Sequence, residues 1–447
     1  MPSPPFATAP IKTSGMPPGI PYIVSNEAGE RFCYYGLRGI LVVVMTRWLV
    51  DSTGQKAPMG EAEAKSWYHL FVSAAYFFPV FGALLADAFW GKYRTILSLS
   101  AVYCTGCILL SVAHTKTALL LSLLLIAIGS GGIKPCVSAH VGDQFGAANA
   151  HLVSKVFGWF YLSINLGSSL SLYLVPVLLE KYGMTAAFGL PAAVMVLATF
   201  CFWSGRHKFV HIPAGGAAFA RESFGPAGLR CLARLTPLFL FVAVFWSLYD
   251  QSSSAWVLQA EHLNLNWLGQ RWQPAQLQVA NPVLILILIP LFSSVVYPAI
   301  HSVFVLTPLR KIGIGLFVTV VSFLIPAQLE VALAHGSVPS VGWQILAYLF
   351  LTSGEVMVSV TFLEFSYTQA PKTMKSVIMA LYLLSISLGN AFTALVNWII
   401  ERSNGGTWLK GPVYYLFFAG LMFAAAVSFV LAARRYRPET VLQQQGE

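Results

Sequence analysis

Charge is scarce in this sequence. Only 10% of its 447 residues are Asp, Glu, Lys or Arg, whereas soluble domains carry about 25%. Basic residues outnumber acidic ones by 27 to 17, which gives a formal net charge of +10. These basic residues flank apolar segments and form no patch interleaved with aromatic side chains, so we predict no nucleic-acid partner.

Motifs of soluble enzymes and secreted proteins are also missing. The chain has no G-x-x-x-x-G-K-[ST] motif and no polar stretch long enough for a nucleotide-binding domain, which argues against ATP as its energy source. The Pro-rich start has no continuous apolar core and does not resemble a signal peptide. The six cysteines are scattered, and Cys104 and Cys107 lie inside an apolar segment, where packing is the expected role. We expect no metal site and no cofactor.

Long apolar runs make up most of the chain. Hydrophobic residues account for 57% of it, and apolar runs of about 20 residues, the length of a membrane-spanning helix, recur throughout. The sequence therefore predicts an all-α membrane protein. We place twelve transmembrane helices at 29–50, 66–89, 94–114, 117–139, 153–177, 184–204, 235–257, 277–301, 309–333, 342–368, 375–400 and 411–433.

The even number of spans places both termini on the same side of the membrane. Basic residues are more numerous in the loops on that side, which predicts that both termini are cytoplasmic. The longest basic loop divides the spans into two six-helix halves, an arrangement typical of secondary transporters. The predicted parts are a cytoplasmic N-terminal segment (1–25), an N-terminal six-helix bundle (26–204), a cytoplasmic linker (205–234), a C-terminal six-helix bundle (235–436) and a cytoplasmic tail (437–447).

The first predicted helix carries a polar stripe. Helical spacing places six polar side chains on one of its faces: Glu27, Glu30, Arg31, Tyr34, Tyr35 and Arg38. A charge inside a bilayer costs several kcal/mol unless it faces partners or a water-filled cavity. Glu27 and Glu30 are also compatible with a helix start among lipid headgroups, but Arg38 lies deeper. We therefore expect Arg38 to face a polar interior.

Three other ionisable residues lie deep within apolar spans: Lys134, Asp250 and Glu355. Together with Arg38 they form two cations and two acids, which allows pairing. Breaking a buried ion pair costs about 3–5 kcal/mol, but protonating the acid releases the cation without leaving a bare charge. Such pairs are suited to switching a protein between two conformations.

Short motifs recur in order along the chain. They are E-x-x-E-R-F-x-Y-Y from Glu27, Gly82–Asp87 with Gly91–Arg94, Gly131–Cys136 with Gly142–Phe145, Phe160–Asn165, Phe245–Gln251, Asn281-Pro282, and Ser353–Glu355 with Glu364–Pro371. Each is weak alone, but together and in this order they resemble the proton-dependent oligopeptide transporter (POT/PTR) family of the major facilitator superfamily. The resemblance covers most of the chain.

The resemblance implies a fold and a function. It implies the major facilitator superfamily fold and a proton-coupled symporter that imports di- and tripeptides by alternating access, acting as a monomer in the lipid bilayer of the bacterial inner membrane. No enzymatic activity is expected, and the proton gradient supplies the energy. Alternatives are a carrier of the same fold for histidine, nitrate or a drug, and a membrane-embedded enzyme, although no G-x-S-x-G motif supports the latter.

The candidate site residues divide by chemistry. Arg38 and Lys134 are expected to bind a peptide carboxylate, and Glu355 its ammonium group. Asn165 and Asn281 are suited to the peptide bond, or alternatively to hydrogen bonds between helices. Tyr34, Tyr35, Tyr76 and Trp246 are expected to line side-chain pockets, with core packing as the alternative. Glu27, Glu30, Arg31 and Asp250 are assigned to proton coupling and gating.

The sequence departs from the family pattern at two places. Many bacterial members insert two helices between the halves, and residues 205–234 are too short and too polar for them. Bacterial relatives often carry Glu where this chain has Asp250, whose side chain is one methylene shorter. Because the first and seventh helices of this superfamily are expected to approach on the outer side, we predict an ion pair between Arg38 and Asp250 that closes the outer mouth.

Overall fold

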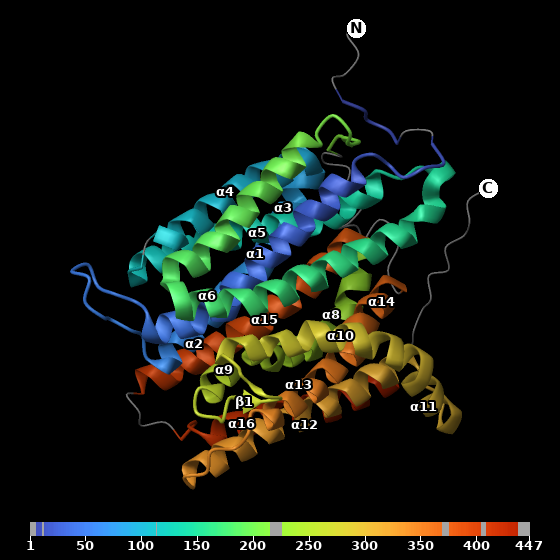
Figure 1. Ribbon diagram of the computed structural model, residues 1–447. Helices are drawn as coiled ribbons and strands as arrows, with labels where there is room; N and C mark the ends of the chain where they lie inside the picture. Colours follow the sequence, from blue (N-terminus) through green and yellow to red (C-terminus); the bar gives the residue numbers. More distant parts are fainter. Residues whose placement is uncertain are drawn as a thin grey trace. The chain divides into compact units, whose positions relative to one another are not determined.

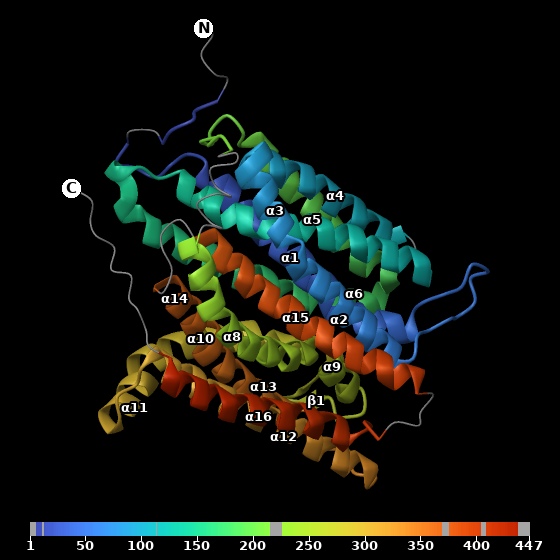
Figure 2. The same ribbon diagram turned by 180° about the vertical axis from the view of Figure 1, so that it is seen from behind.

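The computed structural model is almost entirely helical, and it describes residues 6–10, 13–112, 114–214, 226–368, 375–403 and 408–436. Figures 1 and 2 draw the helices from two sides. The predicted tail, part of the predicted linker and the end of the last motif (Gln369–Pro371) lie outside the described residues. The chain packs into two compact units, which we call unit 1 (Met1–Met59 and Ala74–Arg221) and unit 2 (Gly60–Ser73 and Glu222–Glu447).

Unit 1 is built around two helix pairs, α1 with α6 and α4 with α5. Its elements are α1 (Ile20–Arg47), α3 (Pro79–Leu84), the π-helical turn η1 (Leu85–Trp90), α4 (Lys92–Val112), α5 (Lys116–Asp143), the 3₁₀ turn η2 (Ala147–Leu152) and α6 (Val153–Ser204). Helix α2 (Glu61–Phe77) begins in unit 2 and ends in unit 1. Helix α1 begins nine residues before the predicted span, with Pro21 in its first turn, where the fixed φ of proline favours helix initiation.

Helix α6 contains two of the predicted spans. It runs for 52 residues, with one non-helical residue, Gly183, at φ 79° and ψ −175°. Only glycine adopts such a conformation without strain, so Gly183 divides the helix where the sequence predicts a loop between 177 and 184.

Unit 2 packs α12 against α13 and α16, and α15 against α8; Figure 2 shows α12 and α16 side by side. Its helices are α8 (Pro226–Tyr249), α9 (Ala255–Ala260), α10 (Ala280–Leu291), α11 (Tyr297–Val303), α12 (Pro308–Ala334), α13 (Gly342–Glu355), α14 (Thr361–Thr368), α15 (Lys375–Arg402) and α16 (Pro412–Arg435). The shorter turns are η3 (Asp250–Ser253), η4 (Pro274–Val279), η5 (Phe292–Val296) and η6 (Val356–Val360). In unit 2, the predicted spans 235–257, 277–301 and 342–368 are therefore interrupted helices.

A small β-hairpin follows α9 and is absent from the sequence prediction. Strands β1 (Asn266–Trp267) and β2 (Gln270–Arg271) pair antiparallel. Leu268 and Gly269 connect them with φ values of 52° and 78°. Two consecutive positive φ angles are typical of the type I′ turn, whose twist matches that of a two-residue hairpin.

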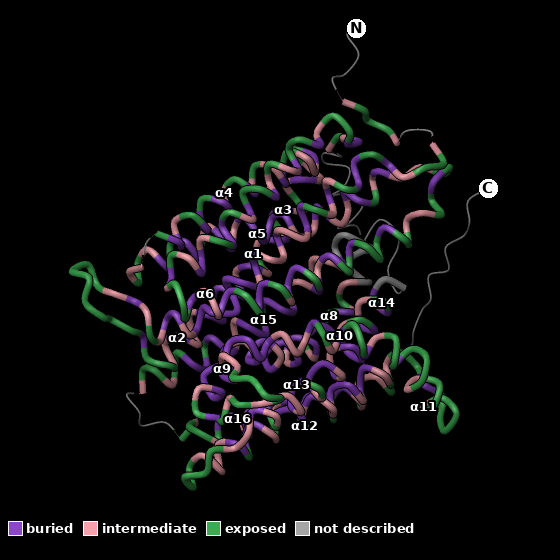
Figure 3. Tube along the Cα trace, viewed as in Figure 1, coloured by how far each residue is buried: buried purple, intermediate pink, exposed green. Residues whose placement is uncertain are grey.

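Ten helical segments among the described residues are long and apolar enough to cross a membrane. Helix α1 is not one of them because of its charged stripe, and the segment Ala147–Ser204 contains two predicted spans. The ten segments thus account for eleven of the predicted spans, and the number of twelve stays a prediction. Figure 3 shows exposed residues along α11, which has no buried residue.

Residues 205–225 separate α6 from α8, and this stretch is too short for two inserted spans of about 20 residues each.

The contact between α3 and α5 leads to a prediction about stability. A Cβ atom added at Gly82 would lie 2.4 Å from Cα and 2.6 Å from the carbonyl oxygen of Gly132, and neither backbone atom can move aside. We expect Gly82→Ala to destabilise unit 1 by about 1–3 kcal/mol through overpacking. Thermal unfolding of the purified protein, followed by tryptophan fluorescence, measures the effect. The control is Gly158→Ala, because no atom lies within 4 Å of a Cβ there; equal melting temperatures for both variants would contradict the prediction.

Candidate functional site

The charged residues near the start of α1 form one cluster in unit 1. Arg31 Nε donates to Glu27 Oε1 at 2.7 Å and lies 3.3 Å from Glu30 Oε2. Glu27 and Glu30 are only 2% and 1% exposed. The helical spacing of the sequence thus brings the three predicted residues together. Two buried carboxyl groups thus share one guanidinium, and Lys134 is a second cation that interacts electrostatically with both.

Lys134 lies between two tyrosine rings of unit 1. Its Nζ is 3.6 Å from the ring centroid of Tyr34 and 4.4 Å from that of Tyr76, which are cation–π distances. Within the described part of the chain, this buried Nζ has no hydrogen-bond partner. The charged groups that interact with it electrostatically are Glu27, Glu30, Arg31 and Arg38. The site therefore combines a desolvated ammonium group with aromatic walls and lacks an acceptor, which an anionic ligand would provide.

The other predicted residues of unit 1 lie on α1 and α6. Arg38 is 5% exposed and therefore buried, as expected for the deeper end of the stripe. Tyr35 stands edge-on to Tyr34 at 5.7 Å. Asn165 donates from Nδ2 to the carbonyl oxygen of Tyr161, 2.9 Å away in its own helix. Its contact with a peptide bond stays a prediction.

Asn281 organises a second cluster, in unit 2. Its Nδ2 donates to Glu355 Oε2 at 2.7 Å and to Thr352 Oγ1 at 3.1 Å, while its Oδ1 accepts from the hydroxyl of Tyr249 at 3.1 Å. These bonds join α10 to α13 and α8, which is the interhelical role left open by the sequence. Glu355 is the last residue of α13, directly before the π-helical turn η6, and such turns are frequent at functional sites.

Trp246 lies beside this cluster and is in contact with other aromatic side chains. Its ring is 5.0 Å from Tyr249 and 6.2 Å from Tyr382, both edge-on. Among the described residues, no acceptor is bonded to its buried Nε1. Trp246 thus offers both an apolar wall and a hydrogen-bond donor, and Tyr249 and Tyr382 extend the predicted aromatic set.

Asp250 belongs to a buried hydrogen-bonded chain of side chains in unit 2. Asn390 Nδ2 donates to Asp250 Oδ2 at 2.6 Å, and Asn390 Oδ1 lies 2.7 Å from His69 Nδ1. His69 Nε2 in turn lies 2.9 Å from Ser254 Oγ. Because the amide oxygen only accepts, Nδ1 of His69 is the donor in this arrangement, and Nε2 accepts from Ser254 when the ring is neutral.

His69 and Asn390 are absent from the sequence-based site. Both have 0% exposure, although both are polar. A histidine inside an apolar span is itself a signal of function, and His69 lies in the predicted span 66–89. The asparagine carries a weaker signal, since interhelical asparagine bonds are common.

The predicted site residues divide between the two units. Arg38 and Lys134 belong to unit 1, whereas Asp250 and Glu355 belong to unit 2. The pairing of Arg38 with Asp250, and the opposition of Lys134 and Glu355, stay predictions. No group of three or more His, Cys, Asp or Glu side chains in the described ranges is arranged to hold a metal ion.

Comparison with known proteins places the chain in a family. The model of the POT family matches residues 93–225 and 226–409. Peptide transporter family 1 of Drosophila melanogaster is 37% identical over 72% of this chain and 48% of its own length. Solute carrier family 15 member 2 of Homo sapiens is 34% identical over 78% of this chain and 54% of its own length. The chain thus spans about half the length of these curated relatives.

Solved structures agree over nearly the whole chain. The POT family transporter PepTSo, crystallised in meso, superposes with a TM-score of 0.85 at 35% identity, covering 94% of this chain and 99% of its own. An auto inhibited POT family peptide transporter superposes with a TM-score of 0.87 at 32% identity, covering 96% and 99%. The predicted all-α major facilitator fold is confirmed, and the chain is an integral membrane protein. From its residues, its fold and these matches, the chain belongs to the POT family.

Proposed function

We propose that this protein is a proton-coupled symporter that imports di- and tripeptides by alternating access. The main support is the environment of Lys134, a buried ammonium group between two tyrosines with no hydrogen-bond acceptor among the described residues. A carboxylate supplies both the missing acceptor and the opposite charge. Relatives named as peptide transporters add to this support.

In this proposal Lys134 binds the peptide carboxylate. Arg38, which interacts electrostatically with Lys134, is a second cation for the same group. Two cations near each other repel, and a peptide carboxylate between them offsets that repulsion. Tyr34, Tyr35 and Tyr76 then line the space around the adjacent side chain and tolerate different shapes.

The peptide ammonium group binds Glu355 in unit 2. Asn281 holds one carboxylate oxygen of Glu355, Oε2, which fixes the orientation of the other. A hydrogen-bonded carboxylate of fixed orientation is a suitable partner for an ammonium group. The free Nε1–H of Trp246 is a donor for a backbone carbonyl of the peptide.

Two buried acidic groups are candidates for proton coupling. In the cluster of Glu27, Glu30 and Arg31, two carboxyl groups share one guanidinium, so one of them is able to take up a proton while the other keeps its partner. In the chain from Asp250 to His69, a proton on His69 Nε2 reverses only the bond to Ser254, which then accepts. The resulting imidazolium compensates the charge of Asp250 across Asn390, so proton binding preserves the chain of hydrogen bonds.

Further properties follow from the same proposal. We place both termini in the cytoplasm and the protein in the bacterial inner membrane, where the proton gradient is directed inward. The protein acts as a monomer without cofactors. Transport is not an enzymatic reaction, and two of the similar proteins, Peptide transporter family 1 and PepTSo, are named as transporters.

Uptake into proteoliposomes tests the proposal. Labelled dialanine is expected to accumulate when an inward proton gradient is imposed, and only to equilibrate without one. Free alanine, histidine and nitrate serve as competitors and are expected to leave dialanine uptake unchanged. Dialanine uptake that ignores the gradient would refute proton coupling, and transport of a competitor in place of dialanine would refute the substrate class.

A further inference from the structure

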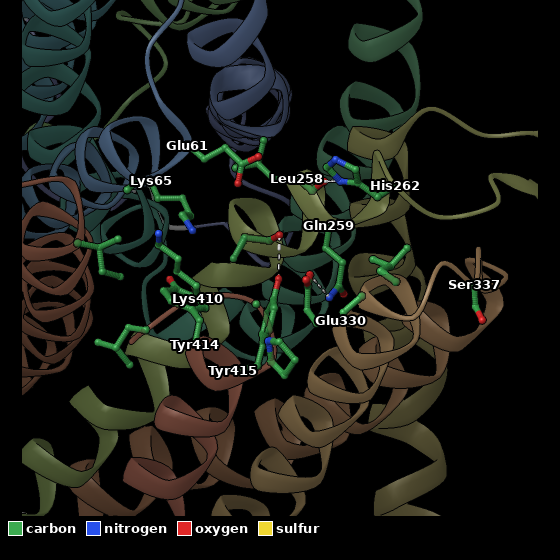
Figure 4. Close-up of a pocket in the computed structure, with 18 of the residues that line it drawn as sticks. Glu61, Lys65, Leu258, Gln259, His262, Glu330, Ser337, Lys410, Tyr414 and Tyr415 are labelled. Atoms are coloured by element: carbon green, nitrogen blue, oxygen red, sulfur yellow. Dashed lines mark hydrogen bonds between the residues drawn. The ribbon is translucent and has the colours of Figure 1, made fainter. Parts of the chain in front are cut away.

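Unit 2 contains a large pocket that shares no residue with the Lys134 or Glu355 clusters. Its volume is about 720 Å³, within the range of pockets that hold small-molecule ligands. Residues from the beginning of α2, from α9, from the end of α12 and from the beginning of α16 line it (Figure 4). We call it the end pocket, because it lies where α12 ends and α2 and α16 begin.

The charges around the end pocket are balanced. Two acids, Glu61 and Glu330, and two bases, Lys65 and Lys410, are among its lining residues. Figure 4 shows Lys65 and Lys410 on one side of the cavity and Glu330 with Gln259 on the other. Lys65 and Glu330 thus place opposite charges on two sides of a cavity of molecular size, which is the first feature that indicates a ligand.

Lys65 is a half-buried cation without an ion pair. Its Nζ lies 4.4 Å from the ring centroid of Tyr414, a cation–π contact. Among the described side chains, no carboxylate lies within 4.0 Å of this nitrogen, although Glu61 and Glu330 interact with it electrostatically at longer range. An ammonium group held in this way is desolvated in part and has donors to spare.

Glu330 is the half-buried acid on the opposite side. Its Oε1 accepts from Nε2 of Gln259 at 2.8 Å. Gln259 is itself 3% exposed and is held by a second bond, to the carbonyl oxygen of Pro326 at 2.9 Å. The carboxylate is therefore positioned by a buried, fully anchored amide, a feature of prearranged binding sites.

We propose that the end pocket binds a small zwitterion, a molecule with one carboxylate and one ammonium group, through Lys65 and Glu330 respectively. A lone anion would meet two carboxylates, a lone cation would meet two lysines, and an apolar ligand would desolvate all four charges without compensation. Only a ligand that carries both charges satisfies both sides. Short peptides and free amino acids share this chemistry.

The position of the end pocket on α2 gives the site a role. Lys65 and His69 are four residues apart, so they lie on one face of α2, one turn from each other. His69 belongs to the same hydrogen-bonded chain as Asp250. A zwitterion in the end pocket is thus held one helical turn from that chain and away from Glu355, as expected for an additional site rather than the transport site itself.

Binding to a variant with an impaired central site tests the inference. In purified Lys134→Ala protein, calorimetry with dialanine is expected to detect one remaining site. Adding Lys65→Gln or Glu330→Gln should weaken that site about tenfold or more, the loss expected for one charge-assisted hydrogen bond. The matched control is Lys181→Gln, an exposed lysine of α6 outside the pocket, which should change nothing. Glu355→Gln provides a second background if Lys134→Ala does not fold.

Ligand analogues complete the experiment. N-acetyl-dialanine lacks the ammonium group and dialanine amide lacks the carboxylate, so both are expected to bind about tenfold or more weakly. Comparing alanine with dialanine separates the two ligand sources. The inference would be overturned if neither background showed a remaining site. It would also be overturned if Lys65→Gln and Glu330→Gln left the affinity of that site for dialanine unchanged. The binding result does not depend on transport, so failure of the uptake experiment leaves it interpretable.

Discussion

Lys134→Ala is expected to abolish proton-driven uptake of dialanine while the protein still folds. The substitution removes the ammonium group between Tyr34 and Tyr76 and leaves the peptide carboxylate without its main partner. A charge-assisted hydrogen bond in a buried site contributes about 3 kcal/mol, so we expect a loss of about 100-fold or more. Initial uptake rates in proteoliposomes under an inward proton gradient measure it. Glu355→Ala should have a similar effect through the ammonium group of the peptide.

Three measurements make this prediction decisive. Gel filtration and thermal unfolding establish that each variant is folded before its uptake is compared. Lys181→Ala, at an exposed position of α6, is the control for loss of a positive charge and should transport normally. Normal driven uptake by Lys134→Ala would exclude Lys134 from substrate binding.

Asp250→Asn is expected to lose concentrative uptake of dialanine but to retain exchange. The amide mimics the protonated acid, and its oxygen is still able to accept the bond from Asn390 that orients Asp250. Exchange of labelled for unlabelled peptide across the membrane needs no net proton movement, whereas accumulation does. We expect counterflow at a near-normal rate together with accumulation reduced to equilibrium, both measured in the same proteoliposomes.

The contrast between the two assays assigns the role of Asp250. Asp51→Asn, at an exposed loop position, is the control for loss of an acid and should keep both activities. If Asp250→Asn protein still binds dialanine but loses uptake and exchange equally, then Asp250 holds the gate closed or supports the fold and does not couple the proton. His69→Gln tests the same chain from its other end and should give the same separation of uptake from exchange if the proton binds at His69.

The membrane class and the approximate positions of the apolar spans were predictable because they depend on local properties. An apolar run of about 20 residues must be helical inside a bilayer, whatever its neighbours are. The stripe on α1 was likewise predictable, because helix periodicity alone places Glu27 and Arg31 one turn apart, and the two are hydrogen-bonded. The interruptions in these helices were less visible, since π-helical turns such as η6 leave no simple sequence pattern.

The candidate site was predicted only in part. Lys134, Asp250 and Glu355 were identifiable because ionisable groups are rare in apolar spans, and each lies within the span where it was expected. Their partners were not. His69 and Asn390 are 321 residues apart, and Asn281 and Glu355 are 74 apart, so no local pattern connects either pair.

The sequence by itself determined the membrane class, the approximate order of the apolar segments and the few positions where a charge must be compensated. Only the tertiary structure decided which groups compensate each charge: tyrosine rings for Lys134, an asparagine for Glu355, and an asparagine and a histidine for Asp250. The physical reason is that the cost of burying a polar group is set by the residue type, whereas its relief depends on hydrogen bonds and ring contacts a few ångströms long, made by helices distant in the chain.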